Sequence, residues 1–237
     1  MELALHKNME TIVGQYEGLI AADIVERQAT ENVSLFAGMD ELMQQYESMF
    51  SIKGMYKLKH KIKHKIKDKV SIALTPEQIA IFLSATRQYE TINYYSRNTG
   101  LFVTRLVQNS YKRGYNNFHI DLNGLLRIDY LGYNLQGREE NPICLDIKGT
   151  AGDYLGKIAS YAHIRVDRAG KNWAEDARHI MLTAAELDPE YHNGPIGSIL
   201  KTNNRTLLPW LRVRGWNHTR EPNRIYFIHP DGREELI

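Results

Sequence analysis

The chain has 237 residues, one cysteine and a formal net charge of +2, and it is long enough to bury a sizeable core without metal or disulfide staples. It has no apolar run near the roughly 18 residues of a membrane span. Its start, MELALHKNMETIVG, carries an early Glu where a signal peptide carries positive charge. Composition therefore excludes a membrane partner and predicts an unprocessed cytoplasmic protein, with the single Cys144 as a buried small hydrophobe.

Charge is distributed unevenly along the first third of the chain. Residues 1–50 contain nine acidic side chains against Lys7 and Arg27, and residues 51–70 contain eight lysines against Asp68. Such blocks are typical of interaction segments, although they can also neutralise each other within a fold.

The amino-terminal region is predicted to be helical. Apolar residues at three- and four-residue steps predict helices over 5–24 and 39–50. Residues 55–70, MYKLKHKIKHKIKDKV, have a narrow apolar stripe at four-residue spacing, which predicts a lysine-rich helix. The alternation of lysine with other residues in this segment would also fit a strand.

Two further helices are expected before residue 115. Thr75 is placed to cap the first, because Pro76 suits the first helical position and Gln78 can return to the cap. The second is predicted over 96–112 and is expected to end at Gly114.

A repeat of small residues follows within residues 146–180. A spacing of eighteen residues with Gly or Ala at fixed places is typical of solenoid turns, each of which buries an apolar pair. The repeated pairs are Ala151 and Ala169, Gly152 and Gly170, Gly156 and Ala174, and Ala159 and Ala177.

At these residues the chain resembles the Gly-rich right-handed β-helix repeats of glutamate synthase and of a formylmethanofuran dehydrogenase subunit. It is more closely similar to uncharacterised archaeal proteins that combine an amino-terminal helical region, such repeats and a short ending like IYFIHPDGREEL. The resemblance implies a β-helical fold and no activity. It carries over no site residue, since the catalytic residues of glutamate synthase lie outside its repeat domain.

Together these features predict an α+β protein with three regions. We expect an α-helical region over 1–115 that includes the lysine-rich helix 55–70, and then a short right-handed β-solenoid-like segment over 116–188. A small α+β cap over 189–237 is expected to end in a hairpin whose first strand is 224–228.

One group of residues suggests catalysis. Two carboxylates on neighbouring strands, with a lysine two residues after the second, can hold Mg²⁺ and position a water, as in restriction-like nucleases. Asp129, Asp146 and Lys148 have this pattern. Ordinary surface charges are the favoured interpretation, because the repeat accounts for the strand around Asp146 without a catalytic role.

The histidines do not predict a metal site. His60 and His64 lie among lysines without a Cys or Glu to complete four ligands. His119, His163 and His179 precede equivalent strand pairs, where they would form either a binding ladder or solvent-facing repeat positions. No nucleophile elbow, P-loop or dinucleotide fingerprint is present, so no cofactor is predicted and a protein without catalytic activity is favoured.

Basic residues give the leading functional hypothesis, a non-catalytic binding or scaffolding protein that contacts RNA or DNA. Lysines in 55–70 could neutralise phosphates, and aromatic rings among arginines near the carboxyl end could stack on bases. The residues concerned are Lys57, Lys59, Lys61, Lys63, Lys65, Lys67, Lys69, Arg212, Arg214 and Trp216. The alternatives are a structural module that forms homo-oligomers and the Mg²⁺-dependent nuclease.

Overall fold

The computed structural model describes residues 38–50, 70, 72–190, 193–213 and 221–237, without the side chains of residues 210, 212 and 213. The chain divides into two compact units, 1–44 and 45–237. Helix α2 (Met39–Glu47) begins in the first unit and ends in the second. The helices predicted over 5–24 and 55–69 lie outside the described residues.

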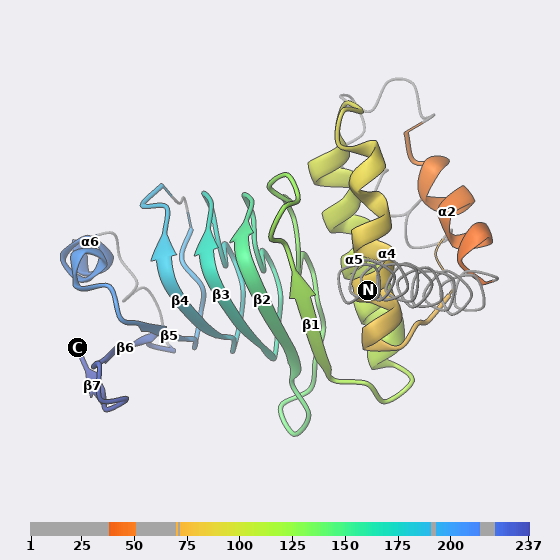
Figure 1. Ribbon diagram of the computed structural model, residues 1–237. Helices are drawn as coiled ribbons and strands as arrows, with labels where there is room; N and C mark the ends of the chain where they lie inside the picture. The colour runs from red at the N-terminus through yellow and green to blue at the C-terminus, as the bar shows by residue number, and fades with distance from the viewer. Residues whose placement is uncertain (1–37, 51–69, 71, 191–192, 214–220) are drawn as a thin grey trace, which may run out of the picture. The chain divides into compact units, whose positions relative to one another are not determined.

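The second unit contains a sheet of seven strands whose spatial order is their order in the chain. Strands β1 to β6 run parallel, and β7 pairs antiparallel with β6, as the predicted terminal hairpin requires. Figure 1 shows β1 to β4 side by side. The strands are β1 (Asn117–Asp121), β2 (Ile143–Ala151), β3 (Ala162–Ala169), β4 (Met181–Leu187), β5 (Ile199–Thr202), β6 (Arg224–Ile228) and β7 (Glu234–Leu236).

The fold class predicted from the sequence is wrong. Instead of an α-helical region, a right-handed β-solenoid-like segment and an α+β cap, the described residues form an open α/β-type sheet with few helices. The repeat spacing still appears in the strand register, because Ala151 lies opposite Ala169 and Ile164 opposite Leu182. A fixed spacing decides which residues are neighbours on adjacent strands. It does not decide the architecture of the sheet as a whole.

Two helices precede the sheet, as the sequence predicts. In α4 (Pro76–Ala85) the capping box is confirmed, because the Gln78 N–H donates to Thr75 Oγ1 at 3.3 Å and the Thr75 N–H donates to Gln78 Oε1 at 2.9 Å. Helix α5 (Tyr95–Tyr111) ends shortly before Gly114. Helix α4 contacts β1, and Figure 1 shows both helices on the side of β1 away from β2. They therefore protect an edge strand that could otherwise pair with another chain.

Aromatic side chains fix the position of α5. The buried ring of Tyr46 meets Phe82 and Phe102 edge-on, at centroid distances of 5.4 and 5.3 Å. Its hydroxyl is 2.6 Å from Thr99 Oγ1. Burial raises the pKa of Tyr46, so the phenol stays neutral and the cluster contains no charge.

Three turns after β1, β2 and β3 share a pattern that we call the turn repeat: DYLGYNL at 129–135, DYLGKIA at 153–159 and KNWAEDA at 171–177. The third residue of each turn is buried, and it is Leu131, Leu155 or Trp173. The second, fourth and sixth residues have positive φ. They are Tyr130, Gly132, Asn134, Tyr154, Gly156, Ile158, Asn172, Ala174 and Asp176. The same backbone path is therefore used three times with different side chains.

Ile158 is the only β-branched residue with positive φ in the turn repeat, at 51°. The left-handed conformation costs an ordinary residue about 1–2 kcal/mol, and Asn tolerates it better. Ile158→Asn should therefore raise the free energy of unfolding by about 1 kcal/mol in a denaturant titration.

Asn134 occupies the equivalent place in the preceding turn at φ 57° and provides the matched control. Asn134→Ile should lower the free energy of unfolding by a similar amount. If both substitutions are destabilising, side-chain packing decides the outcome and backbone strain does not.

Candidate functional site

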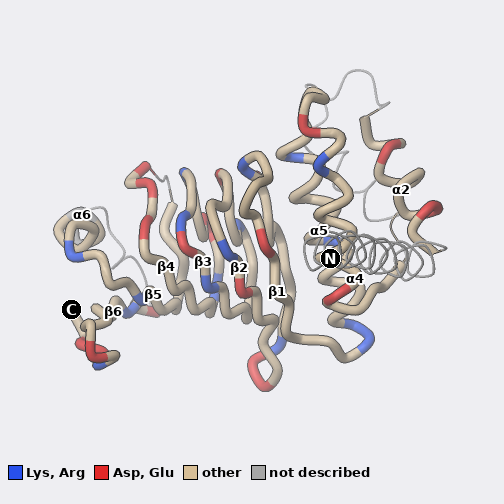
Figure 2. Tube along the Cα trace, viewed as in Figure 1, with Lys and Arg blue, Asp and Glu red and all other residues tan. Residues whose placement is uncertain are grey.

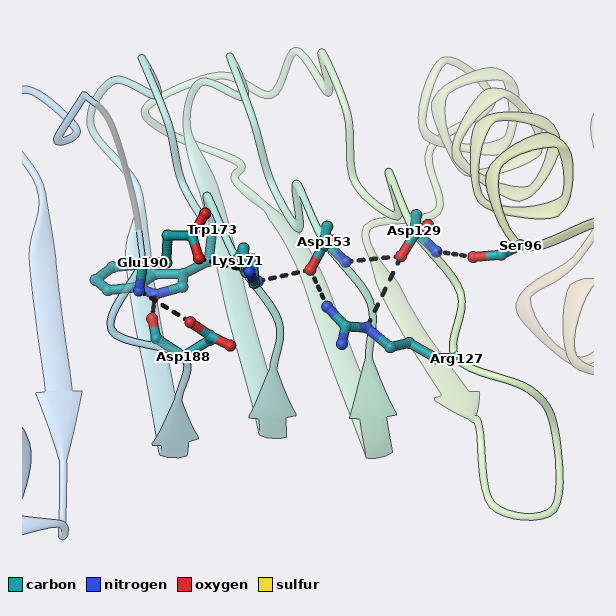
Figure 3. Close-up of polar contacts among 8 residues, drawn as sticks. All are labelled: Ser96, Arg127, Asp129, Asp153, Lys171, Trp173, Asp188 and Glu190. Carbon is teal, nitrogen blue, oxygen red and sulfur yellow. Dashed lines mark hydrogen bonds and ion pairs between the residues drawn. The ribbon is translucent and has the colours of Figure 1, made fainter. Parts of the chain in front are cut away.

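A row of polar contacts connects helix α5 to the turn repeat (Figure 3). The Asp129 N–H donates to Ser96 Oγ at 2.9 Å, and the Asp153 N–H donates to Asp129 Oδ1 at 2.8 Å. The Lys171 N–H donates in turn to Asp153 Oδ1 at 2.7 Å. We call these four residues the carboxylate ladder. Each side-chain oxygen of the ladder accepts the backbone N–H of the first residue of the next turn. Without the ladder, these N–H groups would have no partner.

One arginine neutralises the two carboxylates of the ladder. Arg127 forms an ion pair with Asp153, and its Nε lies 3.9 Å from Asp129 Oδ1. Burial raises the pKa of Asp129, while a hydrogen bond with Ser96 and the charge of Arg127 act in the opposite direction. The carboxylates are therefore held between backbone N–H groups and a guanidinium.

The ladder ends at Lys171, because an ammonium group has no lone pair with which to accept the next N–H. Lys171 Nζ instead donates to Glu190 Oε2 at 2.5 Å, and this bond raises the pKa of the lysine. Asp188 Oδ1 accepts the Glu190 N–H at 2.9 Å, and the Asp188 carbonyl accepts Trp173 Nε1–H at 2.9 Å. A different set of contacts thus closes the last turn.

The chemistry of the carboxylate ladder is structural. Ionised carboxylates are acceptors only, and Asp129 and Asp153 use theirs for backbone N–H groups and for Arg127. This is the pattern of side chains that fix turns by bonding to nearby backbone. It does not present a nucleophile with an adjacent base.

Asp146, the second carboxylate of the nuclease hypothesis, lies on the outer face of β2 with other partners. Arg165 Nε and Nη2 donate to its two carboxylate oxygens at 2.6 and 2.9 Å, and His119 Nδ1 is 3.1 Å from Oδ2. The hydrogen bond from Arg165 is the main reason why the pKa of Asp146 is lowered. Asp146 is therefore ionised and already paired.

The structure places the three predicted nuclease residues in different surroundings. Asp129 belongs to the carboxylate ladder, Asp146 is held by Arg165, and Lys148 lies opposite Asp121 on β1. Within the described ranges, no three His, Cys, Asp or Glu side chains are grouped as a metal site needs. A shared Mg²⁺ between Asp129 and Asp146 thus has no geometric support in this part of the chain.

The predicted nucleic-acid contacts are not described. The seven lysines from 57 to 69, Arg214 and Trp216 lie outside the described residues, and Arg212 is described only by its backbone in α6 (Leu208–Val213). On the described strands, Figure 2 shows basic and acidic residues interspersed across β1 to β4. The sheet therefore presents no large field of one sign there.

The three histidines do not form the binding ladder that their spacing in the sequence allows. His119 lies opposite Asp146, and His163 lies opposite Cys144. His179 stacks on Tyr161 at a centroid distance of 5.1 Å. The three histidines thus have three different environments.

The sequence interpretation missed the partners of both carboxylates. Arg165 lies nineteen residues from Asp146, and Arg127 lies twenty-six residues from Asp153, so only the tertiary structure brings each pair together. A signal for the carboxylate ladder was present, since DYLG occurs at 129–132 and again at 153–156. That repeat could have identified Asp129 and Asp153 as equivalent turn residues.

No helix among the described residues is long and apolar enough to cross a membrane. Comparisons with protein-family models, with curated proteins and with solved structures returned no match, so the resemblance to β-helix repeat proteins stays a prediction.

Proposed function

We propose that the protein is a non-catalytic binding or scaffolding protein that contacts RNA or DNA through the lysine-rich segment 57–69. The observation that carries the proposal is the charge of this segment, with lysine at every second position from Lys57 to Lys69 and only Asp68 opposing it. Several closely spaced cations bind the phosphate backbone by releasing its counterions, without regard to base sequence.

Charge pairing elsewhere in the chain supports the choice of this segment. Three of the lysines on the described turns and strands are each paired with a carboxylate: Lys157 with Glu175 at 2.5 Å, Lys171 with Glu190 at 2.5 Å and Lys201 with Glu234 at 2.6 Å. Paired lysines release few counterions from a polyanion. Within the lysine-rich segment itself, Asp68 is the one acidic residue for seven lysines.

The test is the salt dependence of binding to a fluorescent single-stranded RNA. The wild-type protein should lose affinity steeply as salt rises. Replacing the seven lysines by Gln should reduce the slope of log affinity against log salt by as much as about 5, since each phosphate contact on a single strand contributes about 0.7. A control with Lys157, Lys171 and Lys201 replaced by Gln should keep the wild-type slope, because these lysines are ion-paired.

An unchanged slope in the seven-lysine variant would contradict the proposal. Absence of any binding by the wild-type protein, together with elution at a fixed multiple of the monomer mass, would favour the structural homo-oligomer instead. Trp216→Ala gives a further readout. It should weaken binding to single strands more than to duplexes, because only unpaired bases expose a face for stacking.

A further inference from the structure

Three possible metal ligands, two of them soft sulfur donors, lie in one row on the outer face of the sheet. Cys144 on β2 is in register with His163 on β3, and His163 is in register with Met181 on β4. Each is half-buried and alternates with fully buried neighbours, which places all three side chains on the same outer face. The sheet thus carries a row of thiol, imidazole and thioether, which we call the soft row.

The thiol and the imidazole of the soft row form few hydrogen bonds with described residues. The Cys144 thiol has one weak contact, 3.8 Å from its Sγ to the Pro142 carbonyl. No described residue forms a hydrogen bond with the His163 ring. Cys144 is a free thiol. Both groups can therefore turn their lone pairs to a ligand.

The neighbouring row on the same face shows the contrast. Two residues further along the strands, His119, Asp146 and Arg165 are tied together by hydrogen bonds of 3.1, 2.6 and 2.9 Å. There the imidazole and the carboxylate have already found partners in the protein. The soft row has equivalent positions on the strands but lacks comparable bonds in the described part of the chain.

We propose that Cys144 and His163 bind one soft monovalent metal ion of the Cu(I) class, with Met181 as a weaker third donor. On binding, Cu⁺ displaces the thiol proton, which passes to solvent, so that a neutral Cu–thiolate forms with no change of oxidation state. Neighbouring strands lie about 4.8 Å apart, and an ion with bonds of about 2 Å to nitrogen and about 2.3 Å to sulfur can bridge adjacent side chains across that gap.

The donor set selects the class of ion. Thiolate and thioether are soft ligands that favour Cu(I), and imidazole is compatible with it. Structural Zn²⁺ needs four ligands from Cys, His or carboxylate, and the described residues offer no group of even three. Carboxylate-preferring ions such as Mg²⁺ find no oxygen donor in the row.

The experiment measures Cu(I) affinity anaerobically on the full chain, in competition with a chromogenic Cu(I) chelator. The wild-type protein should bind one Cys144-dependent ion per chain, with an ultraviolet thiolate-to-copper absorption band. Cys144→Ser and His163→Gln should each lower the affinity by more than about 100-fold. Loss of a residue that only hydrogen-bonds to a metal ligand already lowers metal affinity by about 10- to 100-fold. Met181→Leu, which keeps the shape of the side chain, should cause a smaller loss.

His119→Gln is the matched control, because this histidine lies on the same face but is bonded to Asp146. It should keep the wild-type affinity. Circular dichroism of each variant checks that the sheet is intact. Equal Cu(I) affinity in wild-type and Cys144→Ser protein, or equal losses in His119→Gln and His163→Gln, would overturn the proposal. Neither outcome depends on whether the protein binds nucleic acid.

Discussion

Replacing Gly100 by alanine is expected to lower the free energy of unfolding by about 2 kcal/mol. Gly100 lies within α5, and a Cβ built on it would be 1.8 Å from the backbone oxygen of Asp129 and 3.1 Å from the amide nitrogen of Leu131. Overpacking costs about 1–3 kcal/mol and occasionally more, and here the obstacle is backbone that a rotamer change cannot move. The higher helix propensity of alanine offsets about 1 kcal/mol of this cost.

Thermal and denaturant unfolding of Gly100→Ala measure this effect. Gly38→Ala is the control, because no atom of the described residues lies within 4 Å of a Cβ placed on Gly38. It should leave stability nearly unchanged. A Gly100→Ala protein as stable as the wild type would show that α5 can move away from the first turn of the repeat at little cost.

Truncating Trp173 to alanine is expected to have the larger effect, a loss of about 4 kcal/mol in the free energy of unfolding. The side chain is fully buried at the third position of the last turn repeat, and its Nε1–H donates to the Asp188 carbonyl at 2.9 Å. Truncation leaves a large cavity and also an unpaired carbonyl, and each adds to the loss.

Two substitutions at position 173 separate these contributions. Trp173→Phe keeps most of the volume but cannot donate, so its loss should be about 1–2 kcal/mol. Trp173→Leu introduces the residue found at the equivalent positions 131 and 155, and it should fall between the other two. Denaturant titration followed by circular dichroism gives all three values. A loss below about 1 kcal/mol for Trp173→Ala would mean that this turn is not part of the cooperative core.

The local elements were predictable because their causes are local. The cap of α4 depends on Thr75 and Gln78, which are three residues apart, and the α5 boundaries follow from its apolar periodicity and from Gly114. The predicted terminal hairpin corresponds to β6 and β7. In each case the interacting groups lie within one element or across one turn.

The candidate site was not predictable in the same way. Asp129 and Asp146 are close in sequence, yet they lie in separate networks, because their neighbours come from other strands and turns. Arg165 reaches Asp146 from nineteen residues away, and Asp153 reaches Asp129 from twenty-four. Such pairs depend on which strands and turns come to lie side by side, which no local propensity specifies.

The amino-acid sequence by itself determined the capped helices, the repeat spacing and the turns with their left-handed residues, because backbone conformation and side-chain alternation act over a few residues. Tertiary structure alone decided that the strands form one open, mostly parallel sheet, that a carboxylate ladder connects its turns, and that a soft row lies on its strands. The physical reason is that strand pairing joins residues that are distant in the chain. Its outcome depends on the burial of the whole sheet against its turns and helices.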